Sequence, residues 1–109
     1  MVTQNDNNRT AELAVGEQLE VRLPENPTTG FSWAIEENDR RILALDNTAY
    51  TPPAVAGFIG ARGQRAFTFT ARQAGEVALK LKYWRVFAGD DSITERFAVT
   101  VRVVTVGKR

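Results

Sequence analysis

The sequence has no cysteine and no histidine among its 109 residues. Without cysteine there is no disulfide, no thiol chemistry and no zinc–thiolate site. Without histidine the chain lacks the usual general base near neutral pH and the commonest protein metal ligand. A Ser-His-Asp or Cys-His catalytic site is therefore excluded within this chain.

An excess of charge of one sign is also missing, as are long apolar runs. The 14 basic and 13 acidic residues give a net charge of +1, too balanced for a protein that binds nucleic acid or a membrane surface through phosphates. No run approaches the roughly 18 apolar residues of a membrane span. Residues 1–10 are polar and hold no hydrophobic signal core, so we expect an intracellular protein, or a periplasmic or secreted one whose leader has been removed.

Period-two alternation of apolar and polar residues dominates the chain and predicts half-buried β-strands. Five clear strands are expected at 18–23, 31–35, 67–70, 77–83 and 97–103, and two weaker ones at 11–15 and 43–50. Seven short strands in a chain of this length indicate an all-β, immunoglobulin-like, two-sheet antiparallel sandwich. We expect one such domain at 10–109 after a flexible polar tail at 1–9, and at most a brief helical turn near 37–43.

The long connections between these strands are expected to lie together. If consecutive strands run up and down, every second connection falls at the same end of the sandwich. The connections after the second, fourth and sixth strands are the long ones, and they contain loop one (24–30), loop two (57–64) and loop three (85–92). The connections after the first and fifth strands are tight turns.

Loop one is uncharged between two conformational pins. Pro27 fixes its own φ and pushes Asn26 toward an extended conformation, and Gly30 can adopt a positive φ. Thr28 and Thr29 are stiff at χ1 and offer hydroxyls. These features predict a narrow, pre-shaped wedge, although a plain turn that needs only its proline and glycine is the alternative.

Loop two is rich in glycine, but it is not a phosphate-binding loop because no Gly-Lys-Ser/Thr follows. Its backbone could lie against a partner. Alternatively, this is a long loop with Phe58 and Ile59 tucked under the sandwich.

Loop three follows an inward-facing Tyr83, so Trp84 is expected to point outward, with Arg85 and Phe87 close behind. Exposed aromatic residues beside an arginine are typical anchors of protein interfaces. The alternative is that Trp84 covers the sheet edge and Phe87 caps the core.

Together the three loops resemble the chagasin family, protein inhibitors of papain-like cysteine peptidases, over nearly the whole chain. The most specific element is the stretch Asn26-Pro27-Thr28-Thr29-Gly30 followed by Phe31 and Trp33. Loop two contributes Gly60-Ala61-Arg62-Gly63 leading to Phe67. Loop three contributes Tyr83 through Phe87.

The resemblance implies an immunoglobulin-like fold whose three loops enter the peptidase cleft as a wedge. Thr28 and Thr29 would lie over the catalytic residues of the target, Arg85 and Phe87 on the primed side and Gly60–Gly63 on the unprimed side. Binding would be reversible and non-covalent, one to one, by a monomer that is not an enzyme and needs no cofactor. The implied contact residues are Asn26, Pro27, Thr28, Thr29, Gly30, Gly60, Ala61, Arg62, Gly63, Arg85, Val86 and Phe87.

Two positions depart from the family pattern. Arg62 stands where the family has glycine, so it would block a close backbone approach or add an ionic contact. Val86 stands where the family has proline, which leaves loop three less pre-organised by about 0.4–1 kcal/mol. Phe87 matches one of the two residues that the family uses there.

Two other functions remain open from the residues. A sandwich module could bind another protein or a glycan through the same loops. A hydrolase would need to use carboxylates such as Glu36, Glu37, Asp90 and Asp91, but neither adjacent pair has acid/base spacing of its own.

Overall fold

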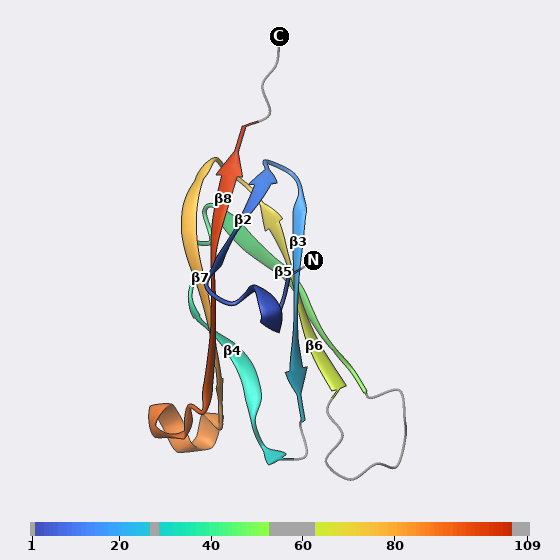
Figure 1. The fold of residues 1–109 in the computed structure, drawn as a ribbon, viewed down its shortest axis with the longest axis vertical. Helices are drawn as coiled ribbons and strands as arrows, with labels where there is room; N and C mark the ends of the chain where they lie inside the picture. Colours follow the sequence, from blue (N-terminus) through green and yellow to red (C-terminus); the bar gives the residue numbers. More distant parts are fainter. Residues whose placement is uncertain (1, 27–28, 53–62, 106–109) are drawn as a thin grey trace.

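The computed structural model describes residues 2–26, 29–52 and 63–105, and its strands form two sheets that face each other (Figure 1). Within the described residues, the first sheet has the order β1-β3-β6-β5 and the second the order β2-β8-β7-β4. The strands are β1 (Val2–Thr3), β2 (Arg9–Ala14), β3 (Gln18–Glu25), β4 (Ser32–Glu37), β5 (Leu43–Thr51), β6 (Gly63–Ala71), β7 (Gly75–Trp84) and β8 (Glu95–Val104), with short 3-10 helices η1 (Gln4–Asp6) and η3 (Val86–Ser92). The predicted all-β sandwich is confirmed.

The core lies between the sheets and is built from alternate residues of the strands. On β3, the residues Leu19, Val21 and Leu23 are buried while Gln18 and Arg22 are exposed. The same alternation fills the opposite sheet, whose inward residues are Val77, Leu79, Leu81 and Tyr83 on β7 and Phe97, Val99, Val101 and Val103 on β8. Because β-branched and aromatic side chains pack well on a pleated surface, these strands form where the sequence predicts them.

The sheets are mixed: four of the described strand pairs are antiparallel, as predicted, and two are parallel. Strand β1 runs parallel to β3, with Val2 opposite Val21. Strand β2 runs parallel to β8, with Arg9 opposite Val99. Neither pair is joined by a hairpin, and strands that are far apart in the chain are free to pair in parallel.

The N-terminal segment, expected as a flexible tail at 1–9, carries structure from residue 2 onward. Val2 is 6% exposed and packs in the core. Asn7 is held from both sides, because its Oδ1 accepts from the Ala98 amide at 2.8 Å and its own amide donates to the Gln4 carbonyl at 3.3 Å. A single apolar residue in a polar stretch, Val2, is the only sequence sign of this arrangement.

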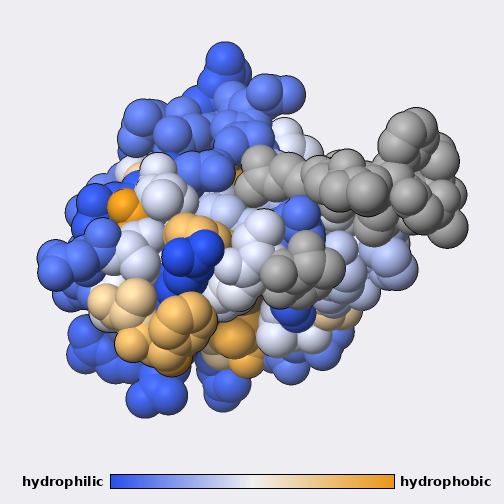
Figure 2. Space-filling view, turned by 90° about the horizontal axis from the view of Figure 1, so that it is seen from below, coloured by the Kyte–Doolittle hydropathy of each residue, from blue (hydrophilic) through white to orange (hydrophobic). Residues whose placement is uncertain are grey.

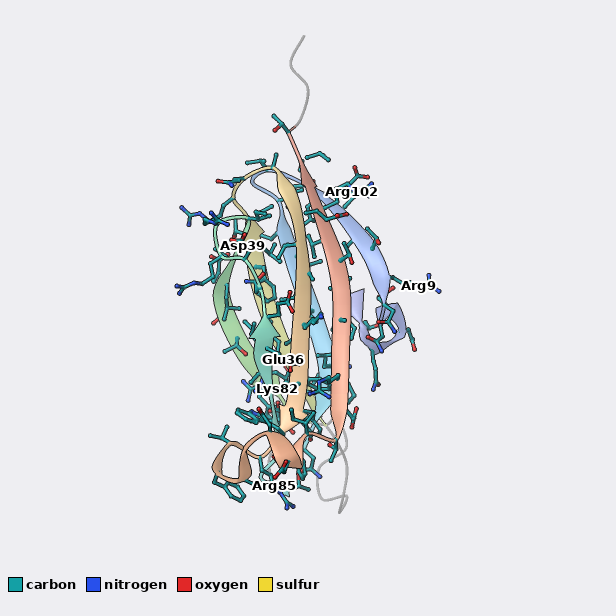
Figure 3. The ribbon with its side chains drawn as sticks, turned by 90° about the vertical axis from the view of Figure 1, so that its left-hand side faces the viewer. Arg9, Glu36, Asp39, Lys82, Arg85 and Arg102 are labelled. Carbon is teal, nitrogen blue, oxygen red and sulfur yellow. The ribbon has the colours of Figure 1, made fainter. Side chains whose placement is uncertain are left out.

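The connection from β4 to β5 is compact. Residues 40–42 form one turn, in which the amides of Ile42 and Leu43 both donate to the Asp39 carbonyl, at 3.1 and 2.9 Å. The brief helical turn expected there is limited to this single turn. Figure 3 places Asp39 toward the end of the molecule away from Arg85.

Candidate functional site

The strand ends that carry the three loops lie at the same end of the sandwich (Figure 1). Glu25, at the end of β3, lies opposite Gly63, where β6 begins after loop two. Arg85 of loop three donates from Nε to the Thr29 carbonyl of loop one at 3.2 Å. The clustering expected from the strand order is therefore present. The predicted residues Pro27, Thr28, Gly60, Ala61 and Arg62, and the alternative core residues Phe58 and Ile59, lie outside the described residues.

Loop one starts and ends on a platform of aromatic rings. Tyr83 lies between Phe31 and Trp33, with centroid separations of 5.4 and 5.0 Å. Its hydroxyl accepts from the Asn26 amide at 3.1 Å, and Trp33 donates from Nε1 to the Pro24 carbonyl at 2.8 Å. Both stems of loop one are thus fixed by rings that belong to the second sheet.

Thr29 ties the two described ends of loop one together. The Thr29 hydroxyl donates to the Asn26 carbonyl at 2.8 Å, and the Thr29 amide points at the same oxygen at 3.3 Å. Gly30 has φ of +81°, a conformation that costs a residue with a Cβ free energy. The Thr29 hydroxyl therefore stiffens the loop from within and holds Asn26 close to Gly30.

Loop three is pinned by a hydroxyl instead of a proline. Ser92 accepts from the Arg85 amide at 2.9 Å, and its hydroxyl lies 3.0 Å from the Arg85 carbonyl and 2.6 Å from that of Gly89. The Ala88 amide also donates to the Arg85 carbonyl, at 3.0 Å. These bonds hold the 3-10 helix η3 together. They constrain loop three internally, although Val86 stands where a proline would do so.

Arg85 joins loop three to loop one. Besides its bond to the Thr29 carbonyl, its guanidinium stacks over the Phe31 ring at 4.4 Å from the centroid. Figure 3 shows Arg85 at the loop end of the molecule. In this structure Arg85 thus contacts its own chain, whereas the resemblance places it on the primed side of a target.

The apolar residues that project from loop three are Val86 and Phe87. Their exposed fractions are 65% and 80%, so Phe87 does not cap the core. Figure 2 looks onto this end and shows hydrophobic side chains gathered on one side of it, bordered by hydrophilic ones. The indole of Trp84 is instead half-buried beneath Lys82, whose Nζ lies 3.6 Å from the ring centroid. Exposed apolar surface of this kind marks a contact surface.

The sequence analysis missed a buried carboxylate below the loops, Glu25. Its exposed fraction is 0%, and one oxygen accepts from the Trp33 amide at 3.0 Å. The other oxygen takes two bonds from Arg65, at 3.1 and 2.9 Å. The signal was in the alternation, because Glu25 is in phase with the inward residue Leu23, and Arg65 with the inward Phe67.

Gly63 is a glycine because of the packing within the first sheet. A Cβ at this position would collide with the Thr51 carbonyl and come within 2.5 Å of the Tyr50 hydroxyl. Gly63 is itself buried. Its role in the free protein is therefore to bring β6 close to β5 where loop two ends.

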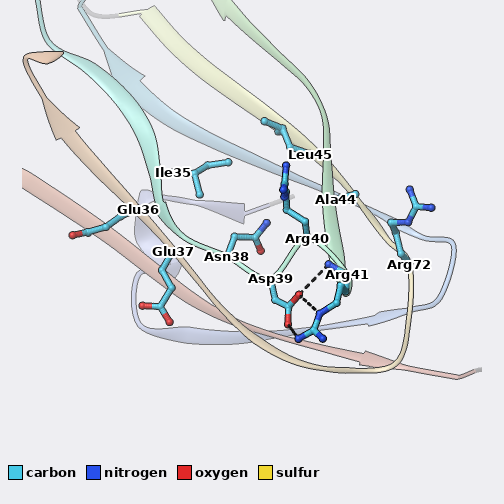
Figure 4. A pocket seen from close by; sticks show the side chains of 10 residues that line it. All are labelled: Ile35, Glu36, Glu37, Asn38, Asp39, Arg40, Arg41, Ala44, Leu45 and Arg72. Carbon is cyan, nitrogen blue, oxygen red and sulfur yellow. Dashed lines mark hydrogen bonds and ion pairs between the residues drawn. The ribbon is translucent and has the colours of Figure 1, made fainter.

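A wide groove lies away from the loops, with a volume of about 1120 Å³ (Figure 4). Its lining consists of Ile35, Glu36, Glu37, Asn38, Asp39, Arg40, Arg41, Ala44, Leu45 and Arg72. Arg41 donates side-chain hydrogen bonds to Asp39, and these hold the pKa of that carboxyl below its usual value of 3.8. The groove has both signs of charge without a group of side chains converging on one point.

Three of the four carboxylates named for the hydrolase alternative are engaged in ion pairs on the surface. Glu36 pairs with Arg96 at 3.2 Å, Glu37 with Lys80 at 3.4 Å and Asp90 with Lys82 at 3.2 Å. No group of three or more acidic residues within the described ranges could hold a metal ion. Nor does that part of the chain contain a helix with the length and apolar character needed to cross a membrane.

The two-sheet fold, with the stems of its long loops at one end, places the protein among β-sandwich modules that present loops to a partner. Residues 12–101 match the Chagasin family peptidase inhibitor I42, and the chain belongs to this family of inhibitors, which are not enzymes. The chain is 37% identical over 105 residues to Chagasin from Trypanosoma cruzi, which covers 93% of this chain and 94% of that protein. The family resemblance found in the sequence is thereby confirmed.

Two solved structures are similar in fold. One is a cysteine protease inhibitor from Entamoeba histolytica, with a TM-score of 0.80 and 17% identity over 94% of this chain and 92% of that one. The other is PbICP-C, solved in complex with falcipain-2, with a TM-score of 0.69 and 16% identity over 95% of each chain. At these identities the likeness concerns the fold.

Proposed function

We propose that this protein is a reversible, non-covalent, tight-binding inhibitor of papain-like cysteine peptidases that fills the active-site cleft with loops one, two and three. The observation that carries the proposal is that Arg85 of loop three contacts the described part of loop one, beside the start of β6. Membership of the chagasin family supports the same function.

The contacts between the loops are formed before any partner arrives. The hydroxyls of Thr29 and Ser92 close loops one and three from within, and Arg85 joins the two loops. A surface that is already ordered loses less conformational entropy on binding. Protease–inhibitor contacts bury about 1,600 Å² in total, an area that three adjacent loops can supply together.

Within the proposal, the residues from Asn26 to Gly30 occupy the centre of the cleft. Gly60, Ala61, Arg62 and Gly63 lie to one side, and Arg85, Val86 and Phe87 to the other. Because the Thr29 hydroxyl is bonded back to the Asn26 carbonyl, we expect that the chain does not present an extended peptide for attack. The chain thus supplies shape, and the chemistry stays with the partner.

The test is a titration of active-site-titrated papain or a cathepsin with the purified protein. We expect activity to fall linearly to zero near a one-to-one ratio. No inhibition of several such enzymes at micromolar protein would refute the proposal, and capture of a different ligand would favour a non-inhibitory binding module.

A charge placed in loop one tests whether this loop enters the cleft. Thr29→Asp should weaken inhibition by several kcal/mol, because a carboxylate would be buried without a partner. The matched control is Thr48→Asp, the same change at an exposed position of β5, which should leave the inhibition constant unchanged. Equal constants for Thr29→Asp and the parent would show that loop one stays outside.

A further inference from the structure

The buried ion pair between Glu25 and Arg65 joins the stems of loops one and two, and we infer that it sets their spacing for inhibition. The inference rests on the proposed function. It makes Glu25 and Arg65 positioning residues, which act through the loops without contacting the peptidase.

Glu25 links its partner Arg65 in the first sheet to Trp33 in the second. Arg65 on β6 gives both Nε and Nη2 to one oxygen of Glu25 on β3, at 3.1 and 2.9 Å. The second oxygen accepts from the amide of Trp33 on β4, at 3.0 Å. Since β3 and β6 belong to the first sheet and β4 to the second, one carboxylate fixes the stems of loop one on both sides of the sandwich.

Arg65 also lies near the other stem of loop two. Its guanidinium lies 5.7 Å from the centroid of Tyr50, which is the next-to-last residue of β5. Gly63 packs against Tyr50 and Thr51 and lies opposite Glu25 in the sheet register. The end of β5 and the start of β6, which carry loop two, are therefore both linked to Glu25, directly or through Arg65.

Stability does not account for this arrangement. The Glu25 side chain is 1% exposed and that of Arg65 25%, and a buried ion pair usually gains little over apolar residues of the same size because both charges lose their water. A guanidinium that donates two hydrogen bonds to a carboxylate does fix the relative orientation of the two side chains. A binding surface made of separate loops needs such a constraint, since loose support of a site costs affinity.

The test compares loss of inhibition with loss of stability. Glu25→Gln keeps the side-chain shape and an acceptor for the Trp33 amide but leaves Arg65 without its anion, and Arg65→Lys keeps the charge but removes the fork. The control is Val101→Ala, a truncation of a fully buried residue of β8. Inhibition constants are measured at a temperature where all variants are folded, together with their thermal unfolding midpoints.

We expect Glu25→Gln to raise the inhibition constant about ten- to a hundredfold, the range that corresponds to losing a charged hydrogen bond. Val101→Ala should also lower the thermal unfolding midpoint, but it should change the inhibition constant less than about threefold. Arg65→Lys should fall between them and still serve if Glu25→Gln fails to fold. Unchanged inhibition by Glu25→Gln or Arg65→Lys, or equal weakening by Val101→Ala, would overturn the inference.

A spectroscopic measurement separates this inference from the proposed function. In amide NMR spectra of the free protein, Glu25→Gln should shift the Asn26, Thr29 and Gly63 signals together, whereas Val101→Ala should not. Shifts confined to residue 25 and its immediate neighbours Asn26 and Gly63, with no shift at Thr29, would refute the inference even if the parent inhibits. If the parent inhibits no peptidase, the proposed function fails, while these shifts still report whether the pair couples the two loops.

Discussion

Truncation of Phe87 offers a direct test of loop three as an anchor, because this ring is 80% exposed in the free protein. Complete burial of a phenylalanine removes about 150–250 Å² from water. Because 80% of Phe87 is still exposed in the free protein, its burial in a complex at about 25 cal/mol per Å² is worth about 3–5 kcal/mol as an upper bound. Alanine keeps a part of that contact. We therefore expect Phe87→Ala to weaken inhibition by about 2–3 kcal/mol, or about 30- to 150-fold.

The same substitution should leave the fold unaffected. Phe87 projects from the end of the molecule and contributes little buried surface, so the free energy of unfolding should change by no more than about 0.5 kcal/mol. Leu45→Ala is the matched control, since Leu45 is 40% exposed and lines the groove away from the loops. Tight-binding titrations at several peptidase concentrations, with thermal unfolding of each variant, give both quantities.

The outcome discriminates sharply between the two sites. If Phe87→Ala inhibits within twofold of the parent, the ring stays in solvent in the complex and loop three is no anchor. If Leu45→Ala weakens inhibition as much as Phe87→Ala, the contact surface includes the groove, and the assignment of the loop end as the binding surface is wrong.

Three further changes probe how the loops are built and where pH acts. Ser92→Ala removes the hydroxyl that bonds Arg85 and Gly89, so it should weaken inhibition by about 1–2 kcal/mol, whereas an unchanged constant would mean that η3 holds without it. Gly63→Ala should lower the free energy of unfolding by about 1–3 kcal/mol, since the added methyl group overlaps Thr51 and Tyr50; an unchanged urea midpoint would contradict this. The pKa of Asp39 is lowered by its bonds to Arg41, so its small contribution to stability is complete above pH 3.8 and lost as pH falls through the lower folded-state pKa. Asp39→Asn should therefore reduce the fall in unfolding midpoint between pH 5 and pH 2, and identical pH profiles would refute the assignment.

Much of this architecture was predictable because the chain obeys simple alternation. Residues such as Val21, Phe69 and Val99 recur at period two, and the two faces of a strand follow from that period alone. Up-and-down strand order then brings loops one and three to the same end, where Arg85 reaches Thr29.

Other features could not be derived from these patterns. Strand β2 pairs in parallel with β8, nearly a chain length away, and nothing in Arg9 to Ala14 specifies that partner. The guanidinium of Arg85 lies against its own chain because it stacks on the Phe31 ring. This is a tertiary contact, which the sequence pattern does not reveal. Glu25 is different: the sequence analysis missed it, although an extension of the alternation on β3 would have indicated that it is buried, and a charge at an inward position indicates a partner such as Arg65.

The direction of β8 has a practical consequence. This strand carries the chain from Glu95, beside the loops, to Val104 at the opposite pole (Figure 1). A peptide handle or fluorophore attached after Thr105 would therefore stand clear of the contact surface. If the protein were immobilised on a bead through such a handle, its three loops would face the solution and could capture peptidases from a mixture.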